Sequence, residues 1–245
     1  EASRIFLVRE SKDAPARLPP LGTLLVQTDM AHTLELIARD GAKVFYEGEV
    51  AKRLAEDMKT RHGLVDLEDL GNYKVRYRQP LLGTYRGHAV ASSPPPSSGG
   101  QIVITILNVM ETLAKNTAWR SVDWLHTYVE ASKRAYADRI LLGDPAYAPW
   151  VKKLMPNLIA KDRAKLISTL ILDRAETSFE IPPGQGAQLP LSLPRNLLTL
   201  PKMIQKEGSD TTHLCTLDKD GNAVSMTTTI NYGWGSGVVA RGTGV

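Results

Sequence analysis

The sequence predicts an α+β fold, because helical and strand-like patterns occupy different segments of the chain. Apolar residues recur at helical spacing in several segments, most clearly in residues 49–61 and 121–142. Apolar and polar residues alternate within residues 73–92, and a turn signal separates two Thr-bearing runs within residues 211–229, as in a β-hairpin. The length of 245 residues is sufficient for one structural domain with a substantial core.

The composition is that of an ordinary globular protein and excludes several kinds of site. Apolar residues make up 42% of the chain and charged residues 23%. The formal net charge of +4 is spread over scattered Lys and Arg residues, which argues against nucleic acid as a partner. The single cysteine excludes an internal disulfide and a multi-cysteine metal site, and the apolar runs are too short for a membrane segment. We expect this residue, Cys215, to be packed within a strand, and the less favoured alternative is a nucleophilic thiol.

Two helices are predicted in the first part of the chain, after a loop over residues 1–20. Thr28 is a suitable N-cap for a helix over residues 29–39, and a second helix covers residues 49–61. The acidic residues of segment 66–70 suit the first turn of a short third helix. The positions predicted to face the core in the first two helices are Met30, Leu34, Ile37, Ala38, Val50, Leu54, Ala55 and Met58.

The next segment predicts strands followed by a helix. Strand-like alternation covers residues 73–77, 81–85 and 89–92. Residues 92–100 are rich in Pro, Ser and Gly, and they have two interpretations. They can be a flexible linker between domains, or a Gly-rich turn at the N-terminus of a helix, which is a natural site for an oxyanion or another anion. The apolar residues that share one face of this helix are Ile102, Ile106, Val109, Met110 and Leu113.

A long amphipathic helix is predicted to begin after the N-cap Ser121 and to end near Leu142, before Gly143. A shorter helix covers residues 160–172, and residues 180–208 are predicted to be a loop because Pro, Gly and Gln are frequent there. The positions of the long helix predicted to face the core are Leu125, Val129, Ala131, Ala135 and Tyr136.

The segment from Thr211 to Thr229 is predicted to be a hairpin. Asp218 suits the first position of a type I turn and Gly221 the left-handed position after it, which makes a three-residue hairpin loop. Counting outward by seven residues on each side of this loop pairs Thr211 with Thr229, with Cβ atoms about 4.5–5.5 Å apart. A two-residue turn would instead pair Thr212 with Thr229, and we favour the first register on turn chemistry.

Two interpretations of the facing threonines remain open on these residues. Thr favours strands, so the pair can be purely structural. It can also be catalytic, because a Thr hydroxyl becomes a competent nucleophile once a base lies beside it, and cutting the chain before Thr211 would free an α-amino group as that base. The run that begins at Asp218 also resembles a calcium loop, but the twelfth position of such a loop requires Glu and here is Thr229, so no metal site is predicted.

Several short motifs, taken in order, resemble the γ-glutamyltransferase family. The resemblance extends from about Leu21 to the end of the chain and implies the αββα sandwich of the N-terminal-nucleophile hydrolases, present here in part. The motifs are residues 45–48, 66–73, 94–100, 136–139, 143–145, 211–213 and 218–224.

The resemblance implies a precursor that cuts itself between Asp210 and Thr211 into a large and a small chain. Thr211 is then the nucleophile, and its freed α-amino group, with a reference pKa of about 7.7–8.0, acts as the general base. Thr229 is implied to orient the nucleophile through a hydrogen bond, and Asn231 is implied to contact the substrate. The glycine-rich turn of the family falls on residues 232–237, in a variant form.

The implied activity is transfer of the γ-glutamyl group of glutathione, or of a related amide, to an amino acid or to water, without a cofactor. Residues 1–210 are then the C-terminal part of the large-chain region and residues 211–245 the first strands of the small-chain region, together one incomplete domain. The rest of the same protein's large and small chains completes the substrate pocket. The alternatives are a related acylase of the same fold, acting on a β-lactam side chain or on poly-γ-glutamate, and a non-catalytic homologue that stays uncut. The family implies a periplasmic or extracellular location.

Overall fold

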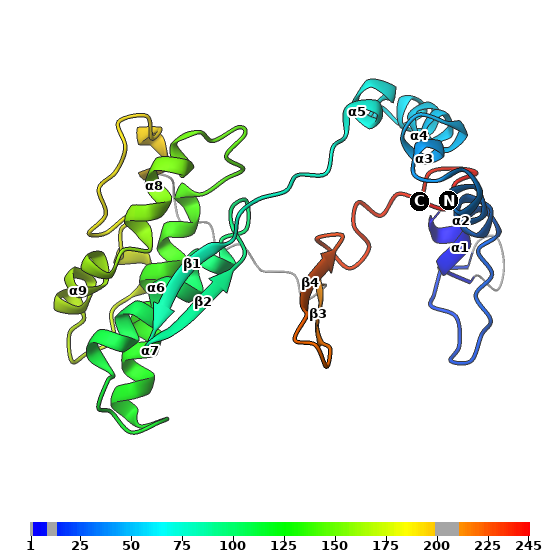
Figure 1. Cartoon of the computed structure of the whole chain (residues 1–245). Coiled ribbons are helices and arrows are strands. Elements are labelled where there is room, and N and C mark those ends of the chain that lie inside the picture. The colour runs from blue at the N-terminus through cyan, green and yellow to red at the C-terminus, as the bar shows by residue number, and fades with distance from the viewer. Residues whose placement is uncertain (1, 9–13, 199–210) are drawn as a thin grey trace. The chain divides into compact units, whose positions relative to one another are not determined.

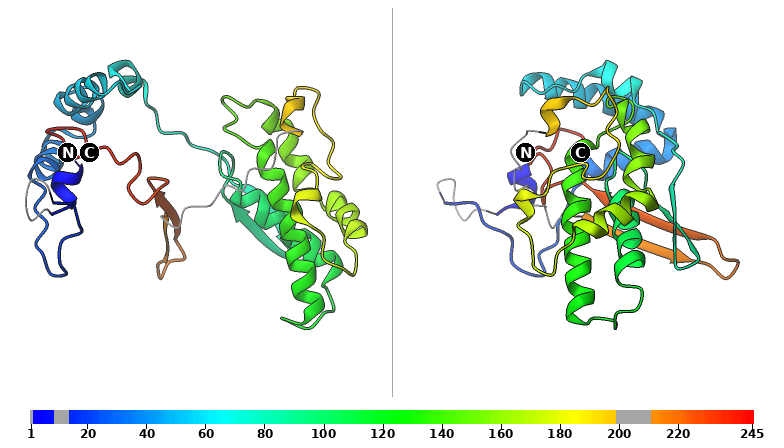
Figure 2. Two further views of the ribbon diagram at one scale, coloured as in Figure 1. Left: turned by 180° about the vertical axis from the view of Figure 1, so that it is seen from behind. Right: turned by 90° about the vertical axis from the view of Figure 1, so that its left-hand side faces the viewer.

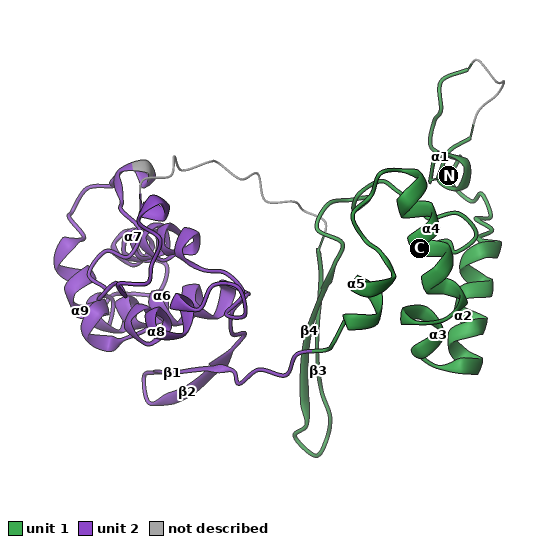
Figure 3. Ribbon diagram, turned by 90° about the horizontal axis from the view of Figure 1, so that it is seen from above, with its two compact units in different colours: residues 1–75, 205–245 green, residues 76–204 purple. Residues whose placement is uncertain are grey.

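The structure, a computed structural model, describes residues 2–8, 14–198 and 211–245. The chain forms two compact units (Figure 3), unit 1 from residues 1–75 and 205–245 and unit 2 from residues 76–204. Each unit combines helices with a two-stranded antiparallel sheet (Figure 1), which confirms the α+β class.

The helices of unit 1 include those predicted over residues 29–39 and 49–61. Their apolar side chains form a small core, to which Ala240 contributes from the other end of the sequence. Thr28 is not an N-cap, since it is the first residue of its helix, and the preceding Gln27 makes no capping bond through its side chain. The helices are α1 (Ala2–Phe6), α2 (Thr28–Asp40), α3 (Lys43–Tyr46), α4 (Glu49–Thr60) and α5 (Leu67–Asn72).

The inner face of α2 differs from the prediction. Leu34 is 57% exposed and Ala38 is exposed as well, whereas Thr33 and Leu36 are buried. A polar residue can take the inner position here because the Thr33 hydroxyl donates a hydrogen bond to the carbonyl of Thr243 at 2.7 Å. This partner lies far along the sequence, so helical periodicity alone misplaces part of the face. Ile37 packs against the core as predicted.

The predicted inner face of α4 and the predicted acidic first turn of α5 are confirmed. Val50 and Leu54 of α4 are buried. The first turn of α5 has a capping box, in which the Asp66 carboxylate accepts hydrogen bonds from the N–H groups of Glu68 and Asp69 at 2.8 and 2.9 Å. The Asp69 carboxylate accepts in return from the Asp66 N–H at 3.1 Å, which closes the box.

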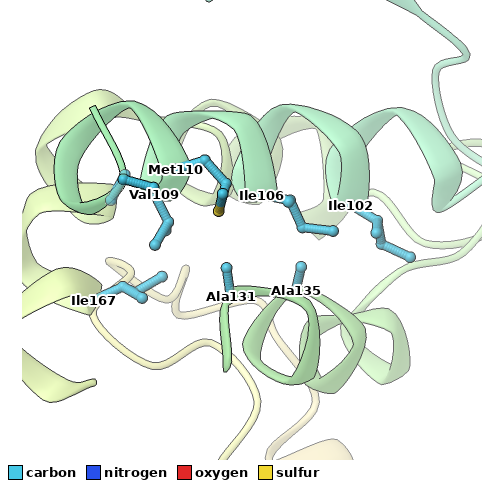
Figure 4. Packing of buried hydrophobic residues seen from close by; sticks show 9 residues of the cluster. Ile102, Ile106, Val109, Met110, Ala131, Ala135 and Ile167 are labelled. Carbon is cyan, nitrogen blue, oxygen red and sulfur yellow. The ribbon is translucent and has the colours of Figure 1, made fainter. Parts of the chain in front are cut away.

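Unit 2 is built around a central helix, α6, and its core lies where this helix meets two others. Ala131 and Ala135 of α7 face Ile102 and Ile106 of α6 (Figure 4), and these small side chains allow the two helices to approach closely. A β-hairpin packs against α6 as well (Figure 2). The elements are β1 (Leu81–Tyr85), β2 (His88–Ser92), α6 (Gly99–Leu113), α7 (Val122–Ala137), α8 (Trp150–Leu158) and α9 (Lys161–Leu170), with 3-10 helices Asp138–Leu141, Ser178–Glu180 and Arg195–Leu198.

At the start of unit 2, one strand prediction is wrong, and the structure decides between the two interpretations of residues 92–100. Residues 73–77 are not a strand, and the chain stays irregular up to Pro80, whose ring removes a backbone donor just before β1. The segment 92–100 is not a linker between domains, because its residues 93–98 form a turn that connects β2 to α6 and both elements belong to the same unit. A Cβ at Gly100 would lie 2.1 Å from the carbonyl oxygen of Ser93, so the turn requires glycine there.

The predictions for the later helices of unit 2 hold in part. The Ser121 hydroxyl caps α7 by accepting from the Trp124 N–H at 3.2 Å, as predicted. The inner face is narrower than predicted, because Leu125, Val129 and Tyr136 are exposed and the small Ala residues make the contact with α6. The sequence pattern does not predict α8, because Pro156 lies inside this helix. The burial of the apolar side chains of α8 outweighs the backbone donor that Pro156 lacks.

A buried ion pair ties four segments of unit 2 together. The Asp138 carboxylate lies 2.8 Å from a guanidinium nitrogen of Arg163 and accepts hydrogen bonds from the Gln101 amide at 3.1 Å and the Gly184 N–H at 2.8 Å. Both charged side chains are at least 96% buried. Burial raises the pKa of Asp138, whereas Arg163 and the two N–H donors act to lower it.

Replacing Asp138 with asparagine is expected to destabilise the protein by about 3–5 kcal/mol, because the charge of Arg163 would stay buried without its partner. Urea unfolding of the full-length protein measures this effect. Asp162→Asn is the matched control, since the Asp162 carboxylate is exposed and its pair with Lys165 is solvated. We expect the control to keep the unfolding midpoint of the parent, and equal shifts in both variants would contradict the role assigned to Asp138.

Candidate active site

The predicted hairpin is present, and its register is the favoured one. The strands β3 (Thr211–Leu217) and β4 (Ala223–Thr229) are antiparallel, and Thr211 pairs with Thr229. The alternative pairing of Thr212 with Thr229 is therefore wrong. The two strands form a slender ribbon (Figure 2).

The turn of this hairpin has the predicted chemistry. Gly221 is left-handed with φ +85°, and its N–H donates to the carbonyl of Asp218 at 3.2 Å. The Asp218 carboxylate accepts hydrogen bonds from the side-chain amide and the N–H of Asn222, both at 2.8 Å, and these bonds hold its pKa below the ordinary value. The stabilisation is therefore present above the ordinary Asp pKa and is lost as the pH falls through the lowered one.

The two facing threonines are in contact through their hydroxyl groups. Thr211 Oγ1 donates to Thr229 Oγ1 at 3.0 Å, and the N–H of Asn231 donates to the same Thr229 oxygen at 2.9 Å. Thr229 thus connects the other two residues implied to act on substrate. Asp210 lies outside the described residues. The arrangement can hold the Thr211 oxygen in one orientation at the first residue of a strand, which is what a nucleophile requires.

A series of tight turns follows this contact. Asn231 is left-handed with φ +76°, and the N–H groups of Gly235 and Gly237 donate to the carbonyls of Tyr232 and Trp234 at 2.8 and 2.7 Å. Gly235 and Gly237 are left-handed too, with φ +53° and +70°, so glycine is favoured at both positions. The variant glycine-rich segment is therefore a compact turn beside the threonine pair.

Next to the threonine pair, on the same face of the ribbon, lies a polar group of side chains that the sequence analysis missed. His213 Nδ1 lies 2.7 Å from Thr227 Oγ1, and His213 Nε2 lies 3.2 Å from Cys215 Sγ and 3.3 Å from Ser225 Oγ. The predicted register already pairs His213 with Thr227 and Cys215 with Ser225 on one face of the hairpin. The strand pairing is therefore the signal from which this polar group could have been predicted.

Cys215 is exposed, so the prediction of a packed residue is wrong. Across the described ranges β3 and β4 pair only with each other, and every residue of both strands is exposed. No group of three or more His, Cys, Asp or Glu side chains in the described part of the chain is arranged to hold a metal ion. Of the helices described here, none is both long and apolar enough to span a membrane.

Comparisons with known proteins identify relatives. A sequence profile of the family described as Gamma-glutamyltranspeptidase matches residues 6–245. The glutathione hydrolase proenzyme of Pseudomonas sp. (strain A14) is 41% identical over 227 residues, covering 91% of this chain and 36% of the relative. The crystal structure of Helicobacter pylori gamma-glutamyltranspeptidase is 38% identical with a TM-score of 0.64, covering 75% of this chain and 51% of that one. Cephalosporin acylase from Bacillus halodurans is 26% identical with a TM-score of 0.71, covering 94% and 37% of the two chains.

These likenesses confirm the fold predicted from the sequence, which is that of the N-terminal-nucleophile hydrolases. This chain forms a part of that fold. The chain spans 36% of the length of the curated relative from Pseudomonas. The family profile nevertheless matches almost every residue of the chain, including both strands of the hairpin. The chain therefore belongs to the gamma-glutamyltranspeptidase family.

Proposed function

We propose that the full-length protein is a self-cleaving γ-glutamyl acyltransferase or hydrolase that acts on glutathione or a related γ-glutamyl amide. The observation that carries this proposal is the 3.0 Å contact between the hydroxyls of Thr211 and Thr229 at the first residue of β3. A relative named as a glutathione hydrolase proenzyme supports both the substrate class and the synthesis as a precursor.

In the proposed maturation step, the Thr211 oxygen attacks the carbonyl carbon of Asp210. The C–N bond between the two residues breaks, the acyl group moves to the oxygen as an ester, and the nitrogen of Thr211 becomes a free amine. Water then hydrolyses the ester, which leaves a carboxylate on Asp210 and a free hydroxyl on Thr211. The new amine is a base of suitable pKa beside the hydroxyl that it must deprotonate.

In the proposed reaction, the same oxygen attacks the γ-carbonyl carbon of the substrate while the α-amine takes up the hydroxyl proton. The proton passes to the departing amine, and the γ-glutamyl group remains on Thr211 as an ester. Water or the amino group of an amino acid then attacks this ester and frees the hydroxyl. Thr229 orients the Thr211 oxygen through both steps. Asn231, whose backbone N–H donates to the same Thr229 oxygen, is proposed to contact the substrate.

The division into two chains follows from this proposal. Residues 1–210 form the end of the large chain and residues 211–245 the first strands of the small chain, within one domain that the rest of the protein completes. The partners are a γ-glutamyl donor and an amino acid or water as acceptor, and no cofactor is needed. A periplasmic or extracellular location is proposed on the resemblance to the family, and cell fractionation tests it.

The test is the intact mass and N-terminal sequence of the purified full-length protein. We expect two chains, the smaller beginning at Thr211, and release of the chromophore from a γ-glutamyl anilide. A single chain of full mass without turnover would instead support the uncut, non-catalytic homologue.

An acylase of the same fold is the second candidate, favoured by the structural match to cephalosporin acylase over 94% of this chain. The two candidates share the nucleophile and differ in the acyl group. A substrate panel separates them: hydrolysis of glutaryl amides without turnover of γ-glutamyl anilides would favour the acylase.

A further inference from the structure

Residues 239–245, here called the docking turn, pack against α2 and α4 within unit 1. Ala240 is 2% exposed and lies in the same core as Leu36, Val50 and Leu54. Thr243 is fully buried. The docking turn follows the proposed cut site in the sequence, whereas both helices precede it.

Two side chains of the helices bind the backbone of the docking turn. The Thr33 hydroxyl of α2 donates to the carbonyl of Thr243 at 2.7 Å, and Arg53 Nη1 of α4 donates to the carbonyl of Gly242 at 2.9 Å. Thr33 is 2% exposed, so its bond to Thr243 is shielded from water. Loss of this donor would leave a carbonyl without a partner in a site that water cannot easily enter.

The docking turn is also shaped to approach the start of α2. Within it, the Ala240 N–H donates to the carbonyl of Val245 at 2.7 Å, and the Thr243 hydroxyl donates to the carbonyl of Ala240 at 2.9 Å. Gly244 is left-handed with φ +71°, and a Cβ there would lie 2.5 Å from the backbone nitrogen of Met30. Glycine is therefore required twice over at this position, for its conformation and for the close approach.

A short run of tight turns connects the docking turn to the candidate active site. It begins at Thr229 Oγ1, which accepts from the N–H of Asn231. It continues through the bonded turns at Gly235 and Gly237, and then reaches the docking turn. Trp234 within this run contacts the Phe6 ring of α1, with ring centroids 5.0 Å apart.

We propose that α2 and α4 hold the docking turn in place and that Thr33 is a positioning residue, which acts through this turn on the strand that carries Thr229. The inference rests on the proposed function. Once the bond before Thr211 is cut, the contacts of α2 and α4 with the docking turn replace the covalent link between the two parts of unit 1. The loss of these contacts therefore lowers the rate more in the cut enzyme than it slows cleavage of the uncut precursor. A displacement of about 1 Å at a reacting group can lower the rate about 100-fold, which sets the scale of the expected effect.

The first test compares Gly244→Ala with Gly41→Ala in the full-length protein. Both glycines are left-handed, with φ +71° and +74°, but a Cβ at Gly41 meets nothing within 4 Å. The pair therefore separates the collision with Met30 from the conformational strain. We expect Gly244→Ala to lower kcat about 10- to 100-fold with little change in KM, and to speed amide hydrogen exchange in residues 239–245. Gly41→Ala should keep kcat within about twofold of the parent.

The second test removes the hydroxyl of Thr33 and restores it. Thr33→Val keeps the shape of the side chain and loses the donor, and we expect about tenfold faster exchange of the docking-turn amides together with a lower kcat. Thr33→Ser keeps the donor and should recover most of both properties. Thr60→Val is the matched control, because the Thr60 hydroxyl donates to the carbonyl of Asp57 within its own helix.

The outcomes separate this inference from the proposed function. Equal effects of Gly244→Ala and Gly41→Ala on exchange and kcat, or no recovery in Thr33→Ser, would overturn the positioning role. Absence of a cut before Thr211 would overturn the proposed function instead, and hydrogen exchange of the docking turn in the uncut protein would still report whether Thr33 holds it.

Discussion

Thr211→Ala is expected to abolish both self-cleavage and turnover in the full-length protein. The substitution removes the oxygen that is proposed to attack the preceding carbonyl and later to carry the acyl group. The Thr229 hydroxyl, 3.0 Å away in the parent, lies on the other strand and has no α-amino group beside it. Gel electrophoresis and intact mass should show one chain of full length, and a γ-glutamyl anilide should release no chromophore.

Thr216→Ala is the matched control for this experiment. It is the same substitution in the same strand, but residue 216 points to the opposite face of the ribbon from residue 211. We expect this variant to be cut and to remain active. Cleavage of Thr211→Ala at the same junction would contradict the assignment of the nucleophile, and loss of cleavage in both variants would point to a folding defect of the hairpin.

The hairpin was predictable from its sequence because its register depends on local chemistry. Gly221 supplies the left-handed residue, Asp218 closes the loop, and counting outward from these positions places Thr211 opposite Thr229. The same counting places His213 opposite Thr227, so that polar neighbour was also available from the pattern. Local rules suffice wherever the partners lie on either side of one turn.

The predictions that were wrong depended on partners far away in the sequence. Thr33 is buried because a carbonyl 210 residues later accepts its hydroxyl, and no local pattern shows that bond. The helix α8 forms around Pro156 because Leu154 and Leu158 pack into the core of unit 2. Cys215 is exposed because, within the described part of the chain, β3 and β4 pair only with each other and every residue of both strands is exposed.

Thr229→Ala is expected to slow both self-cleavage and turnover by about 10²–10⁴-fold, the range found for a positioned acid–base or orienting group. The substitution removes the oxygen that accepts from Thr211 Oγ1 at 3.0 Å and from the N–H of Asn231 at 2.9 Å. The nucleophile then loses its orienting partner, and the turn that carries Asn231 loses a bond at its first residue. The rate of precursor cleavage and kcat for a γ-glutamyl anilide measure the two effects separately.

Two further variants of β4 show whether orientation by the hydroxyl is the cause. Thr229→Ser keeps the oxygen and should retain most of the rate of both steps. Thr228→Ala changes the neighbouring residue, which pairs with Thr212 on the other face of the ribbon, and should leave both rates close to those of the parent. A common loss in Thr229→Ala and Thr228→Ala would mean that β4 had merely been destabilised. An unchanged rate in Thr229→Ala would mean that the facing pair is purely structural. In that case the Thr211 nucleophile would not depend on the Thr229 hydroxyl that the strand register places beside it.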